Sequence, residues 1–229
     1  MKNVIVLLTA VAIACPTMLS AIPKNSNWGM KEALLTVLRD KDTDHTSFRA
    51  AADKLAYILA ADAAEHLETV AIPIETPLAR TTGTLLVYDV VLVPIVRSGL
   101  ALLHSFMKMF ETSRVGFVVL QRDENTALPH LFYAKMPDLN DNTRIIILEP
   151  MIATGGSVLS ALKIITDMGI PNERIIVVSV VCASEGLKRV NEMFPGVTYI
   201  YAAEDPKLNA RKFIVPGLGD FGDRYFGTV

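Results

Sequence analysis

Short apolar runs alternate with helical segments along most of this chain, and this alternation limits its fold more than any other feature of the sequence. The apolar runs occupy positions 90–95, 115–121, 144–148, 174–182 and 198–203. Segments with helical character lie between them at 100–110, 158–169 and 185–194. Strands that are apolar along their whole length are buried on both faces, as in a parallel sheet covered by helices on each side. We therefore predict an α/β fold with a parallel central sheet flanked by helices.

The flanking segments complete this prediction. Apolar spacing predicts two helices, at 27–42 and 46–67, ahead of the first apolar run. The segment 70–89 alternates and contains prolines, which is typical of edge strands and turns. The stretch 130–137 has the pattern of one half of a β-hairpin. One domain over residues 23–229 accommodates all of these elements.

Composition excludes several classes of protein. A chain of 229 residues that is 51% hydrophobic and 20% charged is long and apolar enough for a compact domain, not a disordered chain. The formal net charge of -2 gives no reason to expect a nucleic-acid partner. The two cysteines, Cys15 and Cys182, are too few for a disulfide framework or a zinc site, so both are expected to be packed thiols.

Residues 1–22 stand apart from the rest of the chain. Lys2 precedes an apolar run that ends in small residues near Ala21, the pattern of a signal peptide. Three interpretations compete: a targeting or membrane-attachment segment, a segment packed within the fold, and an upstream extension of a chain whose true start is Met18 or Met30.

The sequence LEPMIATGGS at 148–157 carries the strongest chemical signal. It places an acid, Glu149, and then the small residues 153–157 between an apolar strand and a helix. Ligands of parallel α/β sheets bind at the carboxyl ends of the strands, and a helix N-terminus there attracts anions. The loop is therefore predicted to bind a phosphate. Glu149 suits a neutral or cationic partner, and the vicinal hydroxyls of a ribose would fit it.

Four motifs in register resemble those of the type I phosphoribosyltransferases, and within them the uracil phosphoribosyltransferases, more the eukaryotic branch than the bacterial one. EPMIATGGS resembles the phosphoribosyl-pyrophosphate (PRPP) motif, and LVPIVRSG resembles the pyrophosphate loop. LQRDENTALPHLFYAKMP resembles the second arginine loop and a flexible β-hairpin arm, while FIVPGLGDFGDRYFGT resembles the C-terminal hood segment that binds the base. The likeness covers the chain from about Leu34 to Val229.

The resemblance implies a set of site residues. It assigns catalysis to Arg97, Glu149 and Asp220. The implied PRPP-binding residues are Arg97, Arg122, Glu149, Pro150, Met151, Ile152, Ala153, Thr154, Gly155, Gly156, Ser157 and Asp220. The implied uracil-binding residues are Ile214, Gly219, Asp220 and Phe221. The two charges that follow, Asp223 and Arg224, could form a local ion pair, and we leave them outside the site.

The activity that the resemblance implies is pentosyl transfer from PRPP to uracil, yielding UMP and pyrophosphate. Mg²⁺ is the implied cofactor, held mainly through PRPP and not by dedicated protein ligands. The sequence departs from the family at Glu149, where Asp is usual, and at Ser98, where Ala is usual. Two alternatives therefore stay open: a non-catalytic or regulatory relative that binds uracil nucleotides, and a transferase for another base.

Family resemblance also implies partners and a location. A homodimer or homotetramer is expected, with the arm near 131–136 reaching across the site. GTP is a candidate effector, although no segment of the sequence identifies a site for it. PRPP and free nucleobases are cytosolic, so a cytoplasmic location is expected despite the signal-like segment.

Overall fold

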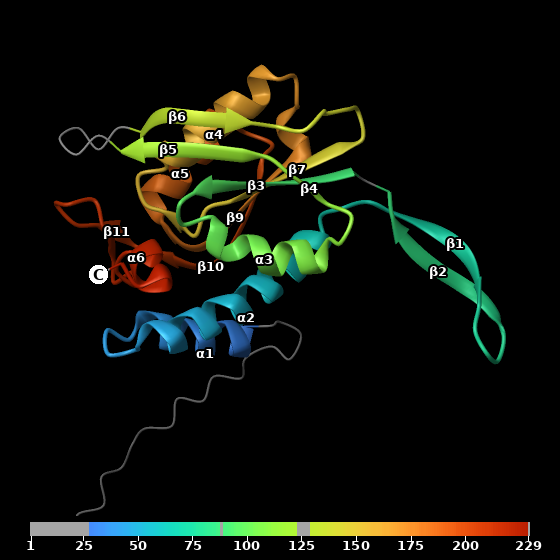
Figure 1. The fold of residues 1–229 in the computed structure, drawn as a ribbon, viewed down its shortest axis with the longest axis horizontal. Coiled ribbons are helices and arrows are strands. Elements are labelled where there is room, and N and C mark those ends of the chain that lie inside the picture. Colours follow the sequence, from blue (N-terminus) through green and yellow to red (C-terminus); the bar gives the residue numbers. More distant parts are fainter. Residues whose placement is uncertain (1–27, 88, 123–128, 229) are drawn as a thin grey trace, which may run out of the picture.

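The computed structural model describes residues 28–87, 89–122 and 129–228, so the segment 1–22 lies outside the described residues. Its centre is an eight-stranded sheet whose main path runs β10-β9-β7-β3-β5-β6 (Figure 1). The first five strands of this path are mutually parallel, and β6 pairs antiparallel with β5. The predicted α/β architecture is confirmed.

The main-path strands are β3 (Asp89–Val96), β5 (Phe117–Arg122), β6 (Pro129–Lys135), β7 (Thr143–Leu148), β9 (Ile175–Ala183) and β10 (Thr198–Asp205). Two short strands, β4 (Arg114–Val115) and β8 (Met151–Ile152), pair with β3 and β9. The helices are α1 (Trp28–Arg39), α2 (His45–Ala64), α3 (Leu100–Met109), α4 (Gly156–Asp167), α5 (Ser184–Met193) and α6 (Phe221–Phe226), with a 3₁₀ turn at Asn172–Arg174.

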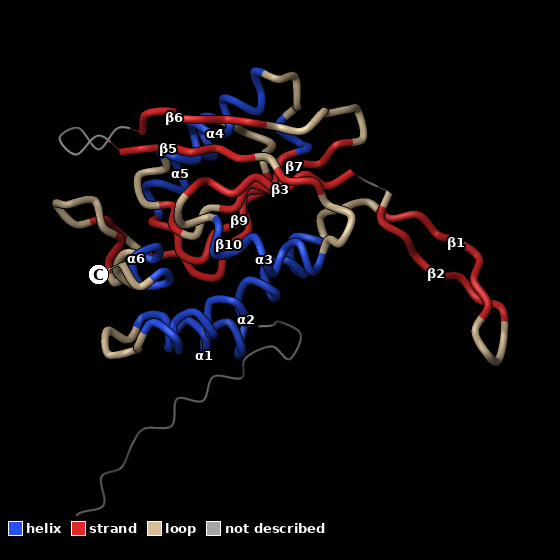
Figure 2. Tube along the Cα trace, viewed as in Figure 1, coloured by secondary structure: helices blue, strands red, loops and turns tan. Residues whose placement is uncertain are grey.

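Helices cover both faces of the sheet and create two hydrophobic cores (Figure 2). Strand β7 shows the division: Ile146 and Leu148 point into the core shared with α1, α2 and α3, while Ile145 and Ile147 point into the core shared with α4. All four are fully buried. Burial on both faces is the reason for the continuous apolar runs in the sequence.

The predicted edge strands at 70–89 are confirmed. They are β1 (Thr69–Glu75) and β2 (Arg80–Leu86), which pair with each other in a separate two-stranded sheet and not with the main sheet. The pair projects away from the body of the molecule (Figure 1). The predicted half-hairpin at 130–137 is β6 in the main sheet, paired with β5, and residues 123–128 between them lie outside the described residues.

After β10 the chain forms a small two-stranded sheet of β11 (Lys207–Leu208) and β12 (Ile214–Val215). It then turns through a glycine-rich stretch into α6, which packs on α2. Residues 214–221 are called the C-terminal segment below. They are the part of the chain that the resemblance assigned to base binding.

Candidate active site

The loop at 153–157, called the phosphate loop below, joins β8 to α4. Its Gly155 adopts a φ of 78°, in the left-handed region that glycine tolerates best, and α4 begins at the next residue. The loop is anchored just ahead of its first residue, because the carbonyl of Pro150 accepts hydrogen bonds from the N–H groups of Val180 and Val181 in β9. This geometry presents the N-terminus of α4 as an anion-binding end.

Helix α5 supports the phosphate loop from behind. A side chain at Gly186 would place its Cβ 1.9 Å from the carbonyl oxygen of Ala153, so only glycine fits there. At Gly155 a Cβ would lie 2.6 Å from Cγ1 of Val190. The guanidinium of Arg189 donates to the carbonyl of Thr154 at 3.2 Å. Backbone and glycine contacts therefore fix the loop against α5.

The neighbouring strands β3 and β7 deliver a cation and an acid to the same end of the sheet. Pro94 of β3 pairs with Leu148 of β7, so the residues that follow each strand meet. Arg97 is exposed, whereas Glu149 is only 6% exposed. The Ser98 hydroxyl donates to Oε1 of Glu149 at 3.0 Å, and the Met151 N–H donates to the same oxygen at 3.4 Å. The carboxylate is thus oriented by both loops.

A partly buried ion pair holds the turn of the C-terminal segment. Arg39 of α1 donates to both carboxylate oxygens of Asp205 at 2.8 and 2.7 Å, and also to the carbonyl of Gly217 at 2.8 Å. The Gly217 N–H donates to Asp205 at 2.8 Å. Burial raises the pKa of Asp205, but the hydrogen bonds from Arg39 and Gly217 and the charge of Arg39 outweigh it and hold the pKa below its ordinary value. The turn is therefore tied to α1 and β10 at once.

Helix α6 is docked on α2 by aromatic and polar contacts. Phe221 is 1% exposed and meets Phe48 edge to face at 5.2 Å between ring centroids. The Tyr225 hydroxyl donates to Asp53 at 2.7 Å, and Arg224 donates to the carbonyls of Leu38, Asp40 and Leu218. Because the Phe221 side chain faces α2, its backbone remains the part of this residue that can meet a ligand.

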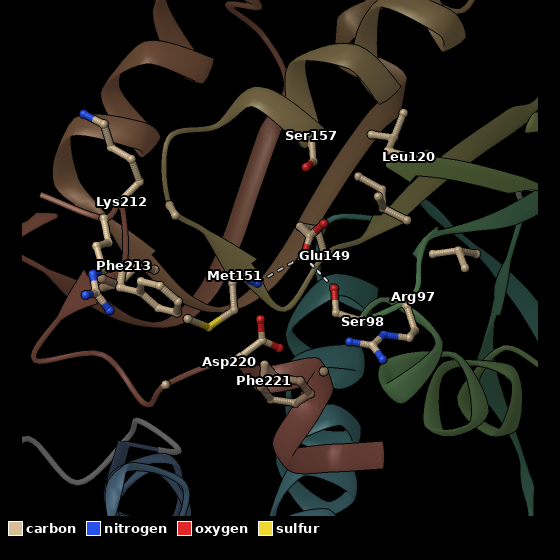
Figure 3. A pocket seen from close by; sticks show the side chains of 17 residues that line it. Arg97, Ser98, Leu120, Glu149, Met151, Ser157, Lys212, Phe213, Asp220 and Phe221 are labelled. Carbon is tan, nitrogen blue, oxygen red and sulfur yellow. Dashed lines mark hydrogen bonds between the residues drawn. The ribbon is translucent and has the colours of Figure 1, made fainter. Parts of the chain in front are cut away.

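These elements surround one cavity of about 260 Å³. Figure 3 shows Arg97, Ser98, Glu149 and Ser157 around it, with Asp220 on the side of α6. The predicted residues on its wall are Arg97, Glu149, Met151, Ala153, Ser157, Ile214, Gly219, Asp220 and Phe221. The structure thus brings together predicted residues from three separated motifs, and Leu120 from the fourth motif also lines the cavity.

Other predicted residues do not contribute to this wall. The Ile152 side chain is buried in the hydrophobic core, and the Pro150 carbonyl is bonded to β9. Thr154 and Gly156 line a different cavity, on the side of α4 and α5. Ser157 lines the first cavity. Gly155 and Gly156 have no side chain, so they can contribute there only through their backbone. Arg122 ends β5, and its side chain lies outside what the structure describes.

Sequence reasoning missed two features of the site. Arg211 and Lys212, from the turn between β11 and β12, also line the cavity, although their signal in the sequence is only two adjacent cations. The predicted local pair of Asp223 with Arg224 was wrong: Asp223 pairs with Arg97 at 2.6 Å, while Arg224 binds backbone carbonyls. The two charges are one residue apart on a helix, and such neighbours point in different directions.

The donor set bears on the expected cofactor. Among the described residues, no three His, Cys, Asp or Glu side chains cluster closely enough to hold a metal ion. Glu149 and Asp220 are the two carboxylates on the cavity wall. This arrangement fits an ion carried mainly by a phosphorylated ligand.

A loop at a helix N-terminus, three cations and two acids line one cavity at the carboxyl ends of parallel strands, which is the arrangement expected of an α/β protein that binds a phosphorylated ligand. The family model described as "Uracil phosphoribosyltransferase" matches residues 29–228. The uracil phosphoribosyltransferase of Campylobacter concisus is 39% identical over 198 residues, covering 86% of this chain and 94% of that protein. That of Mycoplasma genitalium is 41% identical over 195 residues, covering 85% and 93%.

A solved structure shows the same fold. The AQ2163 protein from Aquifex aeolicus superposes with a TM-score of 0.78 at 31% identity, covering 88% of this chain and 95% of that one. The chain described here belongs to the uracil phosphoribosyltransferase family. In the part of it that the structure describes, no helix combines the length and hydropathy needed to cross a membrane.

Proposed function

We propose that this protein transfers the 5-phosphoribosyl group of PRPP to uracil and releases UMP and pyrophosphate. The observation that carries the proposal is the shared cavity. Its wall combines Ala153 and Ser157 of the phosphate loop, the acid Glu149, the cation Arg97 and the C-terminal segment. These are the groups that a phosphate, a ribose, a leaving pyrophosphate and a base would each require.

The leaving-group half of the reaction uses Arg97 and the phosphate loop. The bond between the anomeric carbon and pyrophosphate breaks, and its electron pair departs with the pyrophosphate. Arg97 stabilises the charge that develops there, since a guanidinium presents several donors in a fixed plane. The phosphate loop binds the 5′-phosphate through backbone N–H groups, and Glu149 accepts hydrogen bonds from the ribose hydroxyls.

The base half uses the C-terminal segment. The backbone of Ile214, Gly219 and Phe221 binds the edge of uracil so that N1 faces the anomeric carbon, an orientation effect. A new bond forms between N1 and that carbon, and N1 loses its proton. Asp220 is the carboxylate of this segment on the cavity wall, and we assign that proton to it.

Mg²⁺ bound to the pyrophosphate and hydroxyl oxygens of PRPP would neutralise the charge of the leaving group. The residues named above supply the other roles, and Arg122 is proposed to join Arg97 in binding the pyrophosphate. We place the reaction in the cytoplasm, because PRPP and free nucleobases are cytosolic. GTP stays a predicted effector and is included in the assay below.

We also propose that the protein is a homodimer or homotetramer. The β1–β2 hairpin supports this, because Val70, Ile74 and Leu85 are exposed by 43%, 40% and 53%. Val70 lies opposite Leu85, and Ile74 lies on the same face two pleats further along, so the three form one apolar surface. Light scattering coupled to gel filtration tests this, and a monomer at micromolar concentration would contradict it.

The central experiment mixes the full chain with PRPP, Mg²⁺ and uracil and follows formation of UMP and pyrophosphate, with and without GTP. Parallel reactions replace uracil with cytosine, adenine or hypoxanthine. Turnover with uracil alone is the expected result. Turnover with another base would redirect the proposal to that base, and PRPP or UMP binding without turnover would indicate a regulatory relative.

A further inference from the structure

Asp223 lies just outside the predicted site, in the first turn of α6, yet it contacts Arg97 on the cavity wall. Its Oδ1 accepts from Nη2 of Arg97 at 2.6 Å and from the hydroxyl of Thr228 at 2.6 Å. That hydroxyl in turn accepts from Nη1 of Arg97 at 3.2 Å. Carboxylate, hydroxyl and guanidinium therefore form a closed triangle, called the arginine clamp below.

The arginine clamp is continuous with the acid of the cavity. The Asp223 N–H donates to Oδ1 of Asp220 at 2.9 Å, which makes Asp220 the N-cap of α6. The Asp223 carbonyl accepts from the N–H groups of Gly227 and Thr228 at 2.8 and 3.1 Å, and so fixes the turn that places the Thr228 hydroxyl. One residue thus joins the cation that follows β3 to the acid that begins α6.

The ionised state of Asp223 keeps the arginine clamp formed at neutral pH. The hydrogen bonds from Thr228 and Arg97 and the charge of Arg97 hold the pKa of Asp223 below its ordinary value, so this carboxylate is ionised at neutral pH. The Arg97 side chain is 52% exposed, and a long exposed side chain samples many rotamers unless something restrains it. The clamp occupies Nη1 and Nη2 on one side and leaves the other donors of the guanidinium for a ligand.

We propose that Asp223 and Thr228 are positioning residues that fix the Arg97 guanidinium at the cavity before the substrate arrives. This inference rests on the proposed function, because it assigns to Arg97 the charge that grows on the departing pyrophosphate. A fixed donor needs no reorganisation as the charge develops, so the clamp acts on the chemical step. A carboxylate beside the arginine also weakens its attraction for an anion, so the clamp does not serve ground-state affinity.

These two effects predict a separation of kinetic constants. Asp223→Asn keeps the size of the side chain and removes its charge, so kcat is expected to fall about 10- to 100-fold while KM for PRPP stays the same or falls. Thr228→Val removes the hydroxyl at constant shape and should lower kcat by a smaller factor. Thr228→Ser keeps the hydroxyl and should keep kcat near the wild-type value.

Unchanged kcat in Asp223→Asn and Thr228→Val would overturn the proposal. So would a rise in KM for PRPP at constant kcat, which would make the contact a binding determinant. A merely structural role would lower the melting temperature of Asp223→Asn and Thr228→Val and leave the kcat of the folded fraction intact, and that result would also overturn the proposal.

A measurement without turnover separates this inference from the proposed function. The Nε–H signal of Arg97, assigned by its loss in Arg97→Lys, should report a rigid side chain in the wild type and a mobile one in Asp223→Asn. If the wild type makes no UMP, the proposed function fails, and this comparison still tests the clamp. Equal mobility in the two proteins would overturn the clamp even if UMP forms.

Discussion

The phosphate loop at 153–157 and the C-terminal segment at 214–221 line the same cavity, but different kinds of contact hold them in place. The phosphate loop continues directly from a buried strand and rests on α5 through glycine and backbone contacts. The C-terminal segment has little secondary structure of its own. Side chains from α1 and α2, among them Arg39, Phe48 and Asp53, hold the stretch around it.

This difference predicts how each region responds to substitution. A loop fixed by backbone packing tolerates no added atoms, but it depends little on any one hydrogen bond. A segment fixed by side chains tolerates changes of shape but depends on each polar partner. Four substitutions test the comparison, beginning with the largest expected effect.

Gly186→Ala disrupts the packing of the phosphate loop against α5. Its Cβ would overlap the Ala153 carbonyl at 1.9 Å, so the loop must shift, and a displacement of about 1 Å costs on the order of 100-fold in rate. We expect kcat/KM for PRPP to fall at least that far. Gly29→Ala is the matched control, since nothing lies within 4 Å of its Cβ, and it should keep full activity and add about 0.5 kcal/mol of stability. Retention of PRPP efficiency in Gly186→Ala would show that α5 does not define the loop.

Arg39→Ala removes a side chain that holds the C-terminal segment. It leaves the buried Asp205 carboxylate without its cation, which is expected to cost about 3 kcal/mol of stability, and it frees the Gly217 turn. The KM for uracil should rise more than the KM for PRPP. Arg39→Lys keeps the charge but not the two-pronged geometry, and should recover part of the loss. Equal changes in both KM values would contradict separate support for the two regions.

The same pair makes a prediction about pH. Because the folded pKa of Asp205 is lowered, its contribution to stability is present above the unfolded pKa of about 3.9 and is lost as pH falls through the folded pKa. The free energy of unfolding of the wild type, measured with urea, should therefore fall below about pH 4. In Arg39→Ala this part of the acid dependence should be smaller, and an identical acid profile in both proteins would exclude the pair as its source.

Ser98→Ala tests the acid that precedes the phosphate loop on the same cavity wall. The hydroxyl donates to the carboxylate of Glu149, and a hydrogen bond to a charged group is worth about 1.5–3 kcal/mol, so kcat should fall about tenfold. Glu149→Asp should also be slower, because the shorter side chain withdraws from Ser98. In the double variant the two losses should not add. Additive losses would show that Ser98 does not act through Glu149, and a faster Glu149→Asp would show that the natural acid limits the rate.

Tyr225→Phe is expected to have the smallest effect. It removes one hydrogen bond to Asp53 and keeps the ring that packs on Phe221, so the free energy of unfolding should fall by about 1 kcal/mol. Activity should change less than twofold, since Tyr225 is not on the cavity wall. A large loss of activity at unchanged stability would place this hydroxyl closer to the chemistry than the structure does.

The comparison also explains what could be predicted from the sequence. Apolar runs and the small-residue turn are local signals, so the strands, the helices and the position of Glu149 beside the phosphate loop followed from the sequence. The bonds of Arg39 to Asp205 and of Arg97 to Asp223 join residues 166 and 126 positions apart. No spacing rule relates such positions, and they became visible only once the sheet had brought them together. For the same reason the β1–β2 segment was predicted as strand but not as a separate sheet.

Arg39 lies at the end of α1, whereas Asp205 and Gly217 belong to the last part of the described chain. During synthesis, the strands of the sheet and the phosphate loop are made before the residues that complete the cavity. Arg39 of the first helix can therefore pair with Asp205 and Gly217 only near the end of translation. The specificity for a base would therefore be the last property that the growing protein acquires.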